Sequence, residues 1–289
     1  MRCLFVLLIV NGSLWLAVSA RAQVSPDSKD VSNASPADLP VPVKSSAGEW
    51  GYQDKSGTYV IPPQFDRAEQ FSEGLAVVAL KRKVGYIDTT GRSAIPLKFV
   101  QAEPFSEGLA LVYTTWGMNI LGAEEGYTFF VRAGYVDRSG KFVIKPRYVE
   151  NAASFSRGLA AFKAGTNYSY GKAKWGYLDK EGKWAIQPQF DTAGNFAEGL
   201  APVAVFLDKK SNREKWGYID QAGKLQIPAQ FDDARDFKRG IARVFLAEKD
   251  PKFEHMRHPH GQWGWRCIDK EGEFVACAAK PAPHQESSE

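Results

Sequence analysis

Three histidines and a series of acidic residues are the side chains in this sequence whose types and spacing suit chemistry. The histidines crowd one stretch, "EHMRHPH" at 254–260, and neutral imidazoles bind zinc, copper or nickel. No cysteine or well-spaced acid accompanies His255, His258 and His260. They are therefore weak metal candidates beside the alternative of solvated histidines, and we expect no metal site and no cofactor.

The acidic residues recur at regular intervals, and two converging carboxylates would suit the acid and base of a glycosidase. Glutamates Glu73, Glu107 and Glu198 each precede a glycine, and an aspartate opens a D-x-x-G element six times: Asp54, Asp88, Asp137, Asp179, Asp220 and Asp269. A catalytic pair is needed once, whereas a turn is needed in every repeat. We therefore expect no enzyme and no catalytic residues, and a polysaccharide hydrolase is the less favoured alternative.

The aspartates belong to a repeat that opens with a glycine followed by an aromatic residue. The glycines are Gly51, Gly85, Gly134, Gly176, Gly217 and Gly264, which gives six repeats starting near 50, 84, 133, 175, 216 and 263. Aspartate and glycine at the ends of D-x-x-G predict a type I turn whose last residue is left-handed, a common hairpin connection. Each repeat is therefore predicted to open with a β-hairpin, with two extra residues before the turn of the sixth, "GWRCID". The recurrent glycines and aromatics are predicted to be structural, with close approach of a neighbouring backbone or ring at the glycine.

Two further elements complete the repeat. The return strand ends in isoleucine, a proline and an aromatic residue, as in "IPPQF" at 61–65, and proline suits the end of a strand. A glycine turn then precedes a new apolar strand, as in "FSEGLA" at 71–76. These motifs resemble the WG-repeat (KWG-repeat) family of bacterial exported proteins, over residues 50–277. The resemblance implies a repeated β scaffold and no single activity, and the end repeats look like caps.

The predicted fold is therefore all-β, with six repeats of three or four short antiparallel strands. A propeller-like closed array is favoured, in which the first hairpin completes the last sheet. The alternative is an open β-solenoid or superhelix.

Most variation in repeat length falls between the "GLAxV" strand and the next hairpin. Equivalent points of a repeat array lie on one face, so the five loops at 79–83, 113–132, 163–174, 206–215 and 246–262 should gather on a shared surface. These loops are more basic than the rest of the chain and carry aromatic residues, which suits sugar faces, acidic glycans or peptides. The alternative is loops packed on themselves. The candidate ligand-binding residues are Trp116, Tyr127, Tyr168, Tyr170, Lys209, Lys210 and Arg213.

Both chain ends differ in composition from the repeats. Residues 1–22 carry Arg2, an apolar stretch and a small-x-small pattern, so we expect a signal peptide cleaved before Gln23, with a retained membrane anchor as the alternative. Residues 23–47 are predicted to be a flexible linker, 48–277 the repeat domain and 278–289 a disordered tail. Export favours a disulfide between Cys267 and Cys277 over two buried thiols.

Formal net charge is only +4 over 289 residues, and it falls to +2 when Arg2 and Arg21 leave with the signal peptide. Such a balance, together with export, argues against a nucleic-acid partner. No later stretch is apolar for long enough to span a bilayer. We expect a secreted or periplasmic, non-catalytic protein that binds a glycan, an envelope component or a protein through the loops. The alternative is a structural adaptor in envelope assembly.

Overall fold

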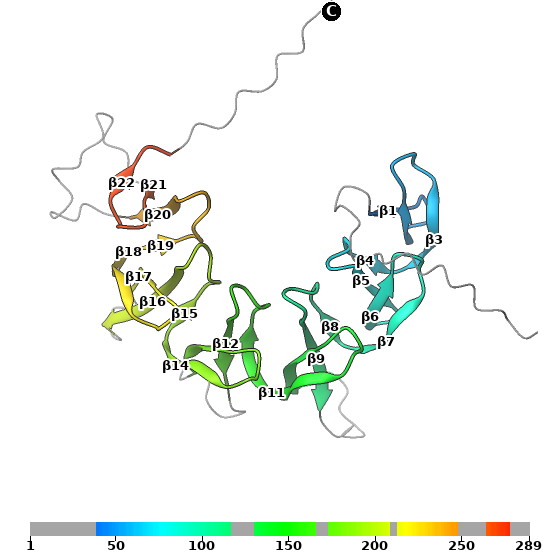
Figure 1. The fold of residues 1–289 in the computed structure, drawn as a ribbon, viewed down its shortest axis with the longest axis horizontal. Helices are drawn as coiled ribbons and strands as arrows, with labels where there is room; N and C mark the ends of the chain where they lie inside the picture. Colours follow the sequence, from blue (N-terminus) through cyan, green and yellow to red (C-terminus); the bar gives the residue numbers. More distant parts are fainter. Residues whose placement is uncertain (1–38, 117–129, 166–172, 209–212, 248–263, 278–289) are drawn as a thin grey trace, which may run out of the picture. The chain divides into compact units, whose positions relative to one another are not determined.

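The computed structural model describes residues 39–116, 130–165, 173–208, 213–247 and 264–277. These residues form 22 β-strands and no helix (Figure 1), as the turn signals and short apolar runs predicted. Among them is no helix long and apolar enough to cross a membrane. The signal peptide expected at 1–22 and the tail expected at 278–289 lie outside the described residues.

Antiparallel sheets follow one another along the chain. The first sheet contains β1 (Val41–Lys44), β2 (Trp50–Gln53) and β3 (Tyr59–Phe65), and the second contains β4 (Arg67–Ala68), β5 (Leu75–Leu80), β6 (Lys83–Asp88) and β7 (Ser93–Phe99). A seven-stranded sheet follows with β8 (Gln101–Ala102), β9 (Ala110–Trp116), β10 (Phe130–Val136), β11 (Phe142–Ala152), β12 (Ala160–Ala164), β13 (Trp175–Leu178) and β14 (Trp184–Phe190). The last two sheets contain β15 (Thr192–Ala193), β16 (Ala201–Asp208), β17 (Arg213–Ile219) and β18 (Leu225–Phe231), then β19 (Asp233–Ala234), β20 (Ala242–Leu246), β21 (Gly264–Ile268) and β22 (Phe274–Val275).

Each four-stranded sheet combines strands from two successive sequence repeats. In the second sheet β4 and β5 come from the first repeat, whereas the hairpin β6–β7 comes from the second. The chain passes from one sheet to the next through one residue, Asp66 between β3 and β4. The seven-stranded sheet equals two such units, because β11 runs on where the other repeats break and pairs with both β10 and β12.

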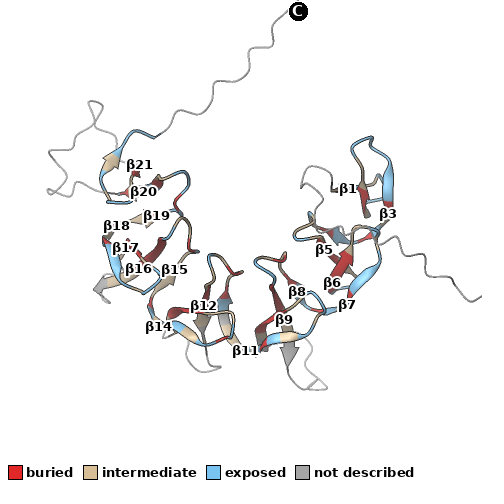
Figure 2. Ribbon diagram, in the orientation of Figure 1, coloured by how far each residue is buried: buried red, intermediate tan, exposed pale blue. Residues whose placement is uncertain are grey.

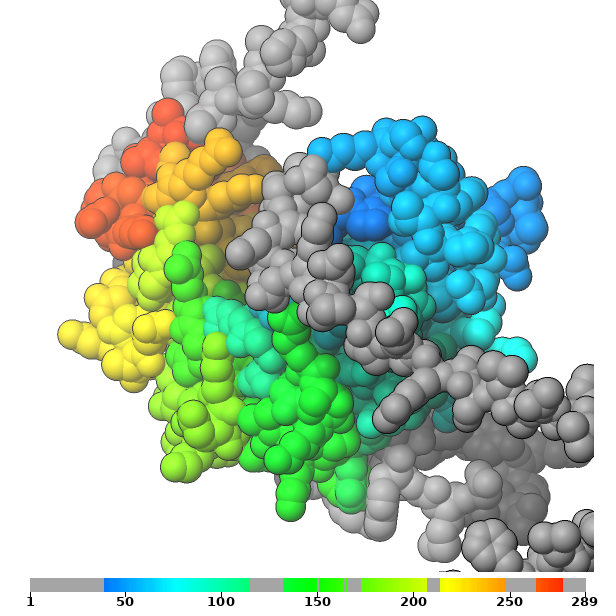
Figure 3. Space-filling model, turned by 45° about the vertical axis from the view of Figure 1, so that its right-hand side comes forward, coloured from blue at the N-terminus to red at the C-terminus, as the bar shows by residue number. Residues whose placement is uncertain are grey.

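The core lies between neighbouring sheets. In β5 the alternate residues Leu75 and Val77 pack in one cluster with the following sheet, whereas Ala76 and Val78 pack in another with the preceding one. Both faces of such a strand are covered, which explains the uninterrupted apolar run "LAVV". Figure 2 shows the contrast between the buried inner strands and the largely exposed β3, β7 and β18. In Figure 3 the surface of β15–β18, yellow-green to yellow, adjoins that of β19–β22, orange to red.

The opening glycine has a steric cause that recurs in five repeats. A Cβ atom added at Gly217 would lie 2.5 Å from the Ile227 carbonyl oxygen and 2.7 Å from the Ala229 nitrogen. Distances of 2.5–2.7 Å to the equivalent isoleucine carbonyl recur at Gly51, Gly85, Gly134 and Gly176. The partner strand bulges toward the glycine at its proline segment, as the register shifts beside Tyr218 show. The predicted close approach of a backbone at this motif is thus confirmed for five glycines.

The aromatic residue after the glycine joins one sheet to the next. Tyr177 is fully buried, and its hydroxyl donates a hydrogen bond of 2.9 Å to the Gly194 carbonyl in the following sheet. Its ring centroid lies 4.9 Å from that of Phe196, the aromatic residue of the next "FAEGLA" segment. Equivalent hydroxyl and ring contacts occur for Tyr52, Tyr86, Tyr135 and Tyr218.

The sixth repeat differs from its predicted alignment. Val244 pairs with Arg266, as Val78 pairs with Gly85 in the second sheet, so Arg266 rather than Gly264 occupies the position of the motif glycine. Trp265 then takes the tryptophan position, and Asp269 follows it by four residues as Asp54 follows Trp50. The prediction of two extra residues was wrong, because the turn sets the register and the glycine–aromatic pair Gly264–Trp265 lies two residues before the motif position.

Arg266 fits at this position because the last return strand, β22, has only two residues and no proline bulge. Cys267 occupies the place that tyrosine holds in the other repeats, and it is buried. It forms a disulfide with Cys277. The described chain offers no following sheet to receive a tyrosine hydroxyl, and the disulfide instead ties the last strand to the segment after β22.

The first sheet also has its own completing strand. β1 pairs with β2, with Val43 opposite Gly51, and takes the place that the "LAxV" strand holds in other sheets. The C-terminal boundary of the linker predicted over 23–47 is therefore too late, because "VPVK" at 41–44 belongs to the first sheet. The described residues show no sheet that combines the first hairpin with the last repeat, so the strand sharing expected for a closed array is not seen among them.

Candidate functional site

The variable loops leave and re-enter the sheets at one edge, which we call the loop edge. The pairs that close the successive loops are Leu80 with Lys83, Trp116 with Phe130, Lys163 with Trp175, Asp208 with Arg213 and Leu246 with Gly264. Each pair joins the end of an "LAxV" strand to the start of the next hairpin. Strand pairing thus places all five loop bases at equivalent positions of the repeat.

Aspartates hold several of these loop bases. Asp232 follows β18, and its carboxylate accepts the Ala247 N–H at 2.9 Å and pairs with the Lys215 ammonium at 2.8 Å. Asp191 likewise accepts the Phe206 N–H and pairs with Lys174. The lysine that precedes the tryptophan in "KWG" is therefore one half of an ion pair at the loop edge. Sequence reasoning missed this role, although the recurring "QFD" after the proline was its signal.

The predicted ligand-binding residues fall at or beyond the ends of the described strands. Trp116 ends β9 and Arg213 begins β17, so both belong to loop bases. Tyr127, Tyr168, Tyr170, Lys209 and Lys210 lie outside the described residues, as do His255, His258 and His260. Within the described ranges, no group of three or more His, Cys, Asp or Glu side chains is arranged to hold a metal ion.

The D-x-x-G turns lie at the opposite edge of the sheets, which we call the turn edge. The Asp54 carboxylate accepts hydrogen bonds from the backbone N–H groups of Ser56 and Thr58, and Gly57 is left-handed with φ of 81°. The Ser56 hydroxyl and the Thr58 N–H lower the pKa of Asp54. Left-handed glycines occur in all six turns, so the turn predicted from sequence is confirmed. Carboxylates that accept these N–H groups also occur at Asp88, Asp137, Asp179, Asp220 and Asp269.

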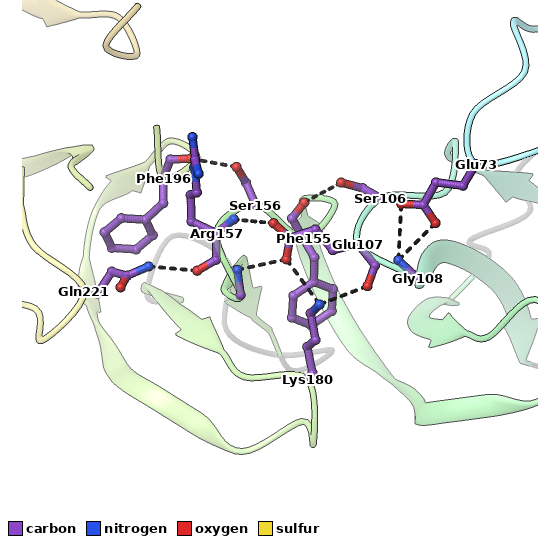
Figure 4. A network of polar contacts seen from close by, with 11 residues as sticks. Glu73, Ser106, Glu107, Gly108, Phe155, Ser156, Arg157, Lys180, Phe196 and Gln221 are labelled. Atoms are coloured by element: carbon purple, nitrogen blue, oxygen red, sulfur yellow. Dashed lines mark hydrogen bonds and ion pairs between the residues drawn. The ribbon is translucent and has the colours of Figure 1, made fainter. Parts of the chain in front are cut away.

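The "FSEG" turns lie at the same edge and form a ladder from sheet to sheet. Each is a two-residue turn in which both central residues have positive φ, 55° at Glu107 and 85° at Gly108. The Glu107 carboxylate accepts the N–H groups of Arg157 at 2.6 Å and Gly158 at 2.9 Å, which are the central residues of the next turn (Figure 4). Glu73 accepts from Gly108, and Glu198 from Arg239 and Gly240.

At three of the ladder turns, a residue from a D-x-x-G turn further along the chain contacts the first central residue. The Lys180 ammonium donates to the Glu107 carbonyl at 2.9 Å and lies 3.4 Å from its carboxylate. Lys270 makes the same contacts with Glu198. At the third turn the crossing residue is Gln221, whose amide donates to the Arg157 carbonyl at 2.8 Å.

Hydrogen bonding at the ladder stabilises the ionised carboxylates. Burial raises the pKa of Glu107, but the N–H groups of Gly158 and Arg157 and the ammonium of Lys180 outweigh it, so the pKa lies below its ordinary value. The pKa of Glu198 is also lowered, first by the Gly240 N–H. Sequence reasoning placed these glutamates beside turn glycines and missed their contacts with the next turn.

Comparison with family models identifies the repeat. A model described as "WG containing repeat" matches residues 50–83, 85–114, 134–168, 175–205 and 216–249. The matched segments end before the sixth repeat, where Arg266 replaces the glycine. No curated protein sequence matches the chain.

Two solved structures resemble the chain at low similarity. A puromycin hydrolase S511A mutant complexed with PGG has 12% sequence identity and a TM-score of 0.42, over 82% of this chain and 45% of that one. The tricorn protease has 15% identity and a TM-score of 0.32, over 84% of this chain and 26% of that one. The chain thus spans less than half of either protein, and TM-scores below 0.5 support no inference about its activity.

Proposed function

The chain belongs to the WG-containing repeat family, and we propose that it is an exported, non-catalytic β-repeat protein that binds a glycan, an envelope component or a protein through its loop edge. The observation that carries the proposal is the common position of the five loop bases, each closed by the last pair of the same two strands. Loops of variable length held at equivalent points of a rigid scaffold are a common basis of recognition.

The anchoring of the loop bases also supports binding. Asp66, Asp191 and Asp232 each accept an N–H from a residue at or just beyond the end of an "LAxV" strand: Lys81, Phe206 and Ala247. A charge-assisted hydrogen bond of this kind contributes about 1.5–3 kcal/mol when one partner is ionised, and less where solvent screens it. The loop bases are thus fixed to the neighbouring sheet, which lowers the entropy that a bound ligand must overcome.

The non-catalytic part of the proposal is based on how the recurring acids are used. The turn aspartates accept N–H groups of their own turns, and Glu73, Glu107 and Glu198 accept those of the next turn. A carboxylate engaged in this way has a structural task in its own repeat. We therefore assign these acids to the frame and not to a glycosidase pair.

The binding proposal is tested with a glycan array and a pull-down from envelope extract. The variant replaces Trp116, Tyr168, Tyr170, Lys209 and Lys210 with alanine. The matched control replaces Lys141 and Lys224, which are exposed at the turn edge, with alanine. We expect at least a tenfold loss of binding in the first variant and none in the control. Unchanged binding by a folded loop variant would refute the loop-edge proposal.

Export is the second part of the proposal, with residues 1–22 removed as a signal peptide and the mature protein secreted or periplasmic. N-terminal sequencing of the protein recovered outside the cytoplasm is expected to begin at Gln23. A mature protein that retains residues 1–22 would contradict cleavage and favour the membrane-anchored alternative.

For the array we propose the open alternative rather than the closed propeller-like one. The support is that β1 completes the first sheet and that the last sheet takes all its strands from residues 233–275. Spin labels at Ser56→Cys and Glu271→Cys should lie much further apart than labels at Ser139→Cys and Glu181→Cys, which sit in consecutive D-x-x-G turns. Equal distances in the two pairs would indicate a closed array.

A further inference from the structure

The ladder of "FSEG" turns changes character at its third turn. Five such turns follow one another, with first central residues at 73, 107, 157, 198 and 239. At three of the four steps between them, this first central residue accepts a central N–H group of the next turn. Glutamate occupies that position at 73, 107 and 198, but arginine occupies it at 157. Arg157 has the same backbone conformation as Glu107, with φ of 55° in both. A guanidinium has no acceptor atoms, so it cannot replace the carboxylate.

Because position 157 is arginine and not glutamate, two backbone N–H groups of the following turn have no carboxylate to accept them. Glu107 accepts the N–H groups of Arg157 and Gly158, and Glu198 accepts those of Arg239 and Gly240. The corresponding donors of the fourth turn are the N–H groups of Glu198 and Gly199. Within the described part of the chain, neither has a hydrogen-bond acceptor.

The crossing residues have changed together with the ladder residue. Lys180 and Lys270 contact the ladder glutamates Glu107 and Glu198, whereas the neutral Gln221 contacts Arg157. A lysine there would face a second cation. Arg157 is exposed, and among the described residues no acid forms an ion pair with its side chain. The third step therefore combines an unpaired guanidinium with two outward N–H groups.

We propose that this step binds the carboxylate of an external acidic peptide, held by the N–H groups of Glu198 and Gly199 and by the Arg157 guanidinium. The steps from Glu107 and Glu198 show the fit directly, because each holds a glutamate side chain at 2.5–2.9 Å from the two equivalent N–H groups. Two adjacent N–H groups with positive φ form a recognised anion-binding concavity, and arginine strengthens it by a charge-assisted contact. This site lies at the turn edge, opposite the variable loops, and is independent of the loop-edge proposal.

The test titrates ¹⁵N-labelled protein with a short glutamate-containing peptide and with the same peptide carrying glutamine. We expect saturable shifts of the Glu198 and Gly199 amide signals with the glutamate peptide only. Arg157→Glu should weaken this binding at least tenfold, because its own carboxylate then occupies the two N–H groups, as Glu107 does one step earlier. Glutamate is already accepted at this backbone conformation in three turns, so the variant should fold.

Two controls make the result specific. Arg82→Glu makes the same charge change at an exposed residue of positive φ at the loop edge, and binding should be unaffected. Arg157→Glu combined with Gln221→Lys rebuilds the Glu107–Lys180 arrangement and should raise the melting temperature above that of the wild type. Equal shifts with the glutamine peptide, or binding that persists in Arg157→Glu, would overturn the proposal. Tighter binding of a uronic acid trisaccharide than of the peptide would overturn the choice of a peptide ligand.

Discussion

Replacing Gly217 by alanine tests the steric account of the repeated glycine. The added Cβ would lie 2.5 Å from the Ile227 carbonyl oxygen, 2.7 Å from the Ala229 nitrogen and 2.8 Å from the Pro228 carbonyl carbon. Real Cβ contacts essentially never fall below 3.0 Å, and all three neighbours are backbone atoms. β17 and β18 must therefore separate by about 0.5 Å or more at this point.

The expected cost follows from the contacts beside the bulge. Separation weakens two backbone hydrogen bonds at about 1 kcal/mol each, and it displaces Tyr218, whose hydroxyl bond to the Arg235 carbonyl contributes about 1 kcal/mol more. The free energy of unfolding should fall by about 3 kcal/mol, which lowers the melting temperature by about 6–12 °C in a domain of this size. Amide hydrogen exchange should increase most at residues 225–231, because repeat arrays open locally.

The control is Gly57→Ala. Gly57 has φ of 81°, but no atom lies within 4 Å of an added Cβ, so only the left-handed conformation is penalised. That cost is about 1 kcal/mol, or about 2–4 °C. If urea and thermal unfolding show Gly217→Ala to be no more destabilised than Gly57→Ala, close backbone approach is not the reason for the glycine.

Three further predictions address the contacts between sheets. Tyr177→Phe keeps the ring contact with Phe196 but removes the hydroxyl bond to Gly194, so urea unfolding should show a loss of about 1 kcal/mol; an equal loss in the exposed control Tyr59→Phe would contradict this. Burial raises the pKa of Tyr86 and Tyr135 well above its ordinary value, so their contribution to stability is complete below the unfolded pKa of about 10 and is lost as pH rises through the folded pKa. The melting temperature should therefore fall from about pH 10 upward. Ionisation of these rings near pH 10 without unfolding would refute the burial account. Reduction of the Cys267–Cys277 disulfide should destabilise the last sheet by about 2–3 kcal/mol, a value estimated from the short loop that it closes. Amide hydrogen exchange should then become faster only at residues 264–277, and a uniform increase along the chain would contradict the prediction.

Local signals in the sequence were sufficient for the strands and turns of each repeat. Asp54 and Gly57 define a turn through their own chemistry, and the apolar run at Leu75–Val78 defines a strand buried on both faces. The pairing of β5 with the hairpin of the next repeat could not be predicted in this way, because it depends on contacts between residues far apart in sequence. The same limit applies to β1, since only its pairing with β2 distinguishes "VPVK" from the linker before it.

The sequence does contain signals for the register of the sixth repeat and for the contacts between successive "FSEG" turns. Counting four residues back from Asp269 leads to Trp265, which gives the register that the structure shows for the sixth repeat. Arginine replaces the glutamate beside the turn glycine at 157 and 239, and the residue that contacts the ladder turn is lysine at 180 and 270 but glutamine at 221. Such coupled changes within one chain indicate contact, although they do not show which two turns meet.

The offset between sequence repeat and sheet has a consequence for how such a chain can evolve. After the first sheet, each repeat contributes a short segment and an "LAxV" strand that pair with the hairpin of the next repeat, as β4 and β5 do with β6 and β7. A gene segment of one repeat length, duplicated in tandem at any internal position, therefore supplies the half-sheet that its predecessor lacks and offers the same half to its successor. Repeat number can change without redesign of any interface. Only the two ends are constrained, by β1 at one and by Arg266 and the disulfide at the other.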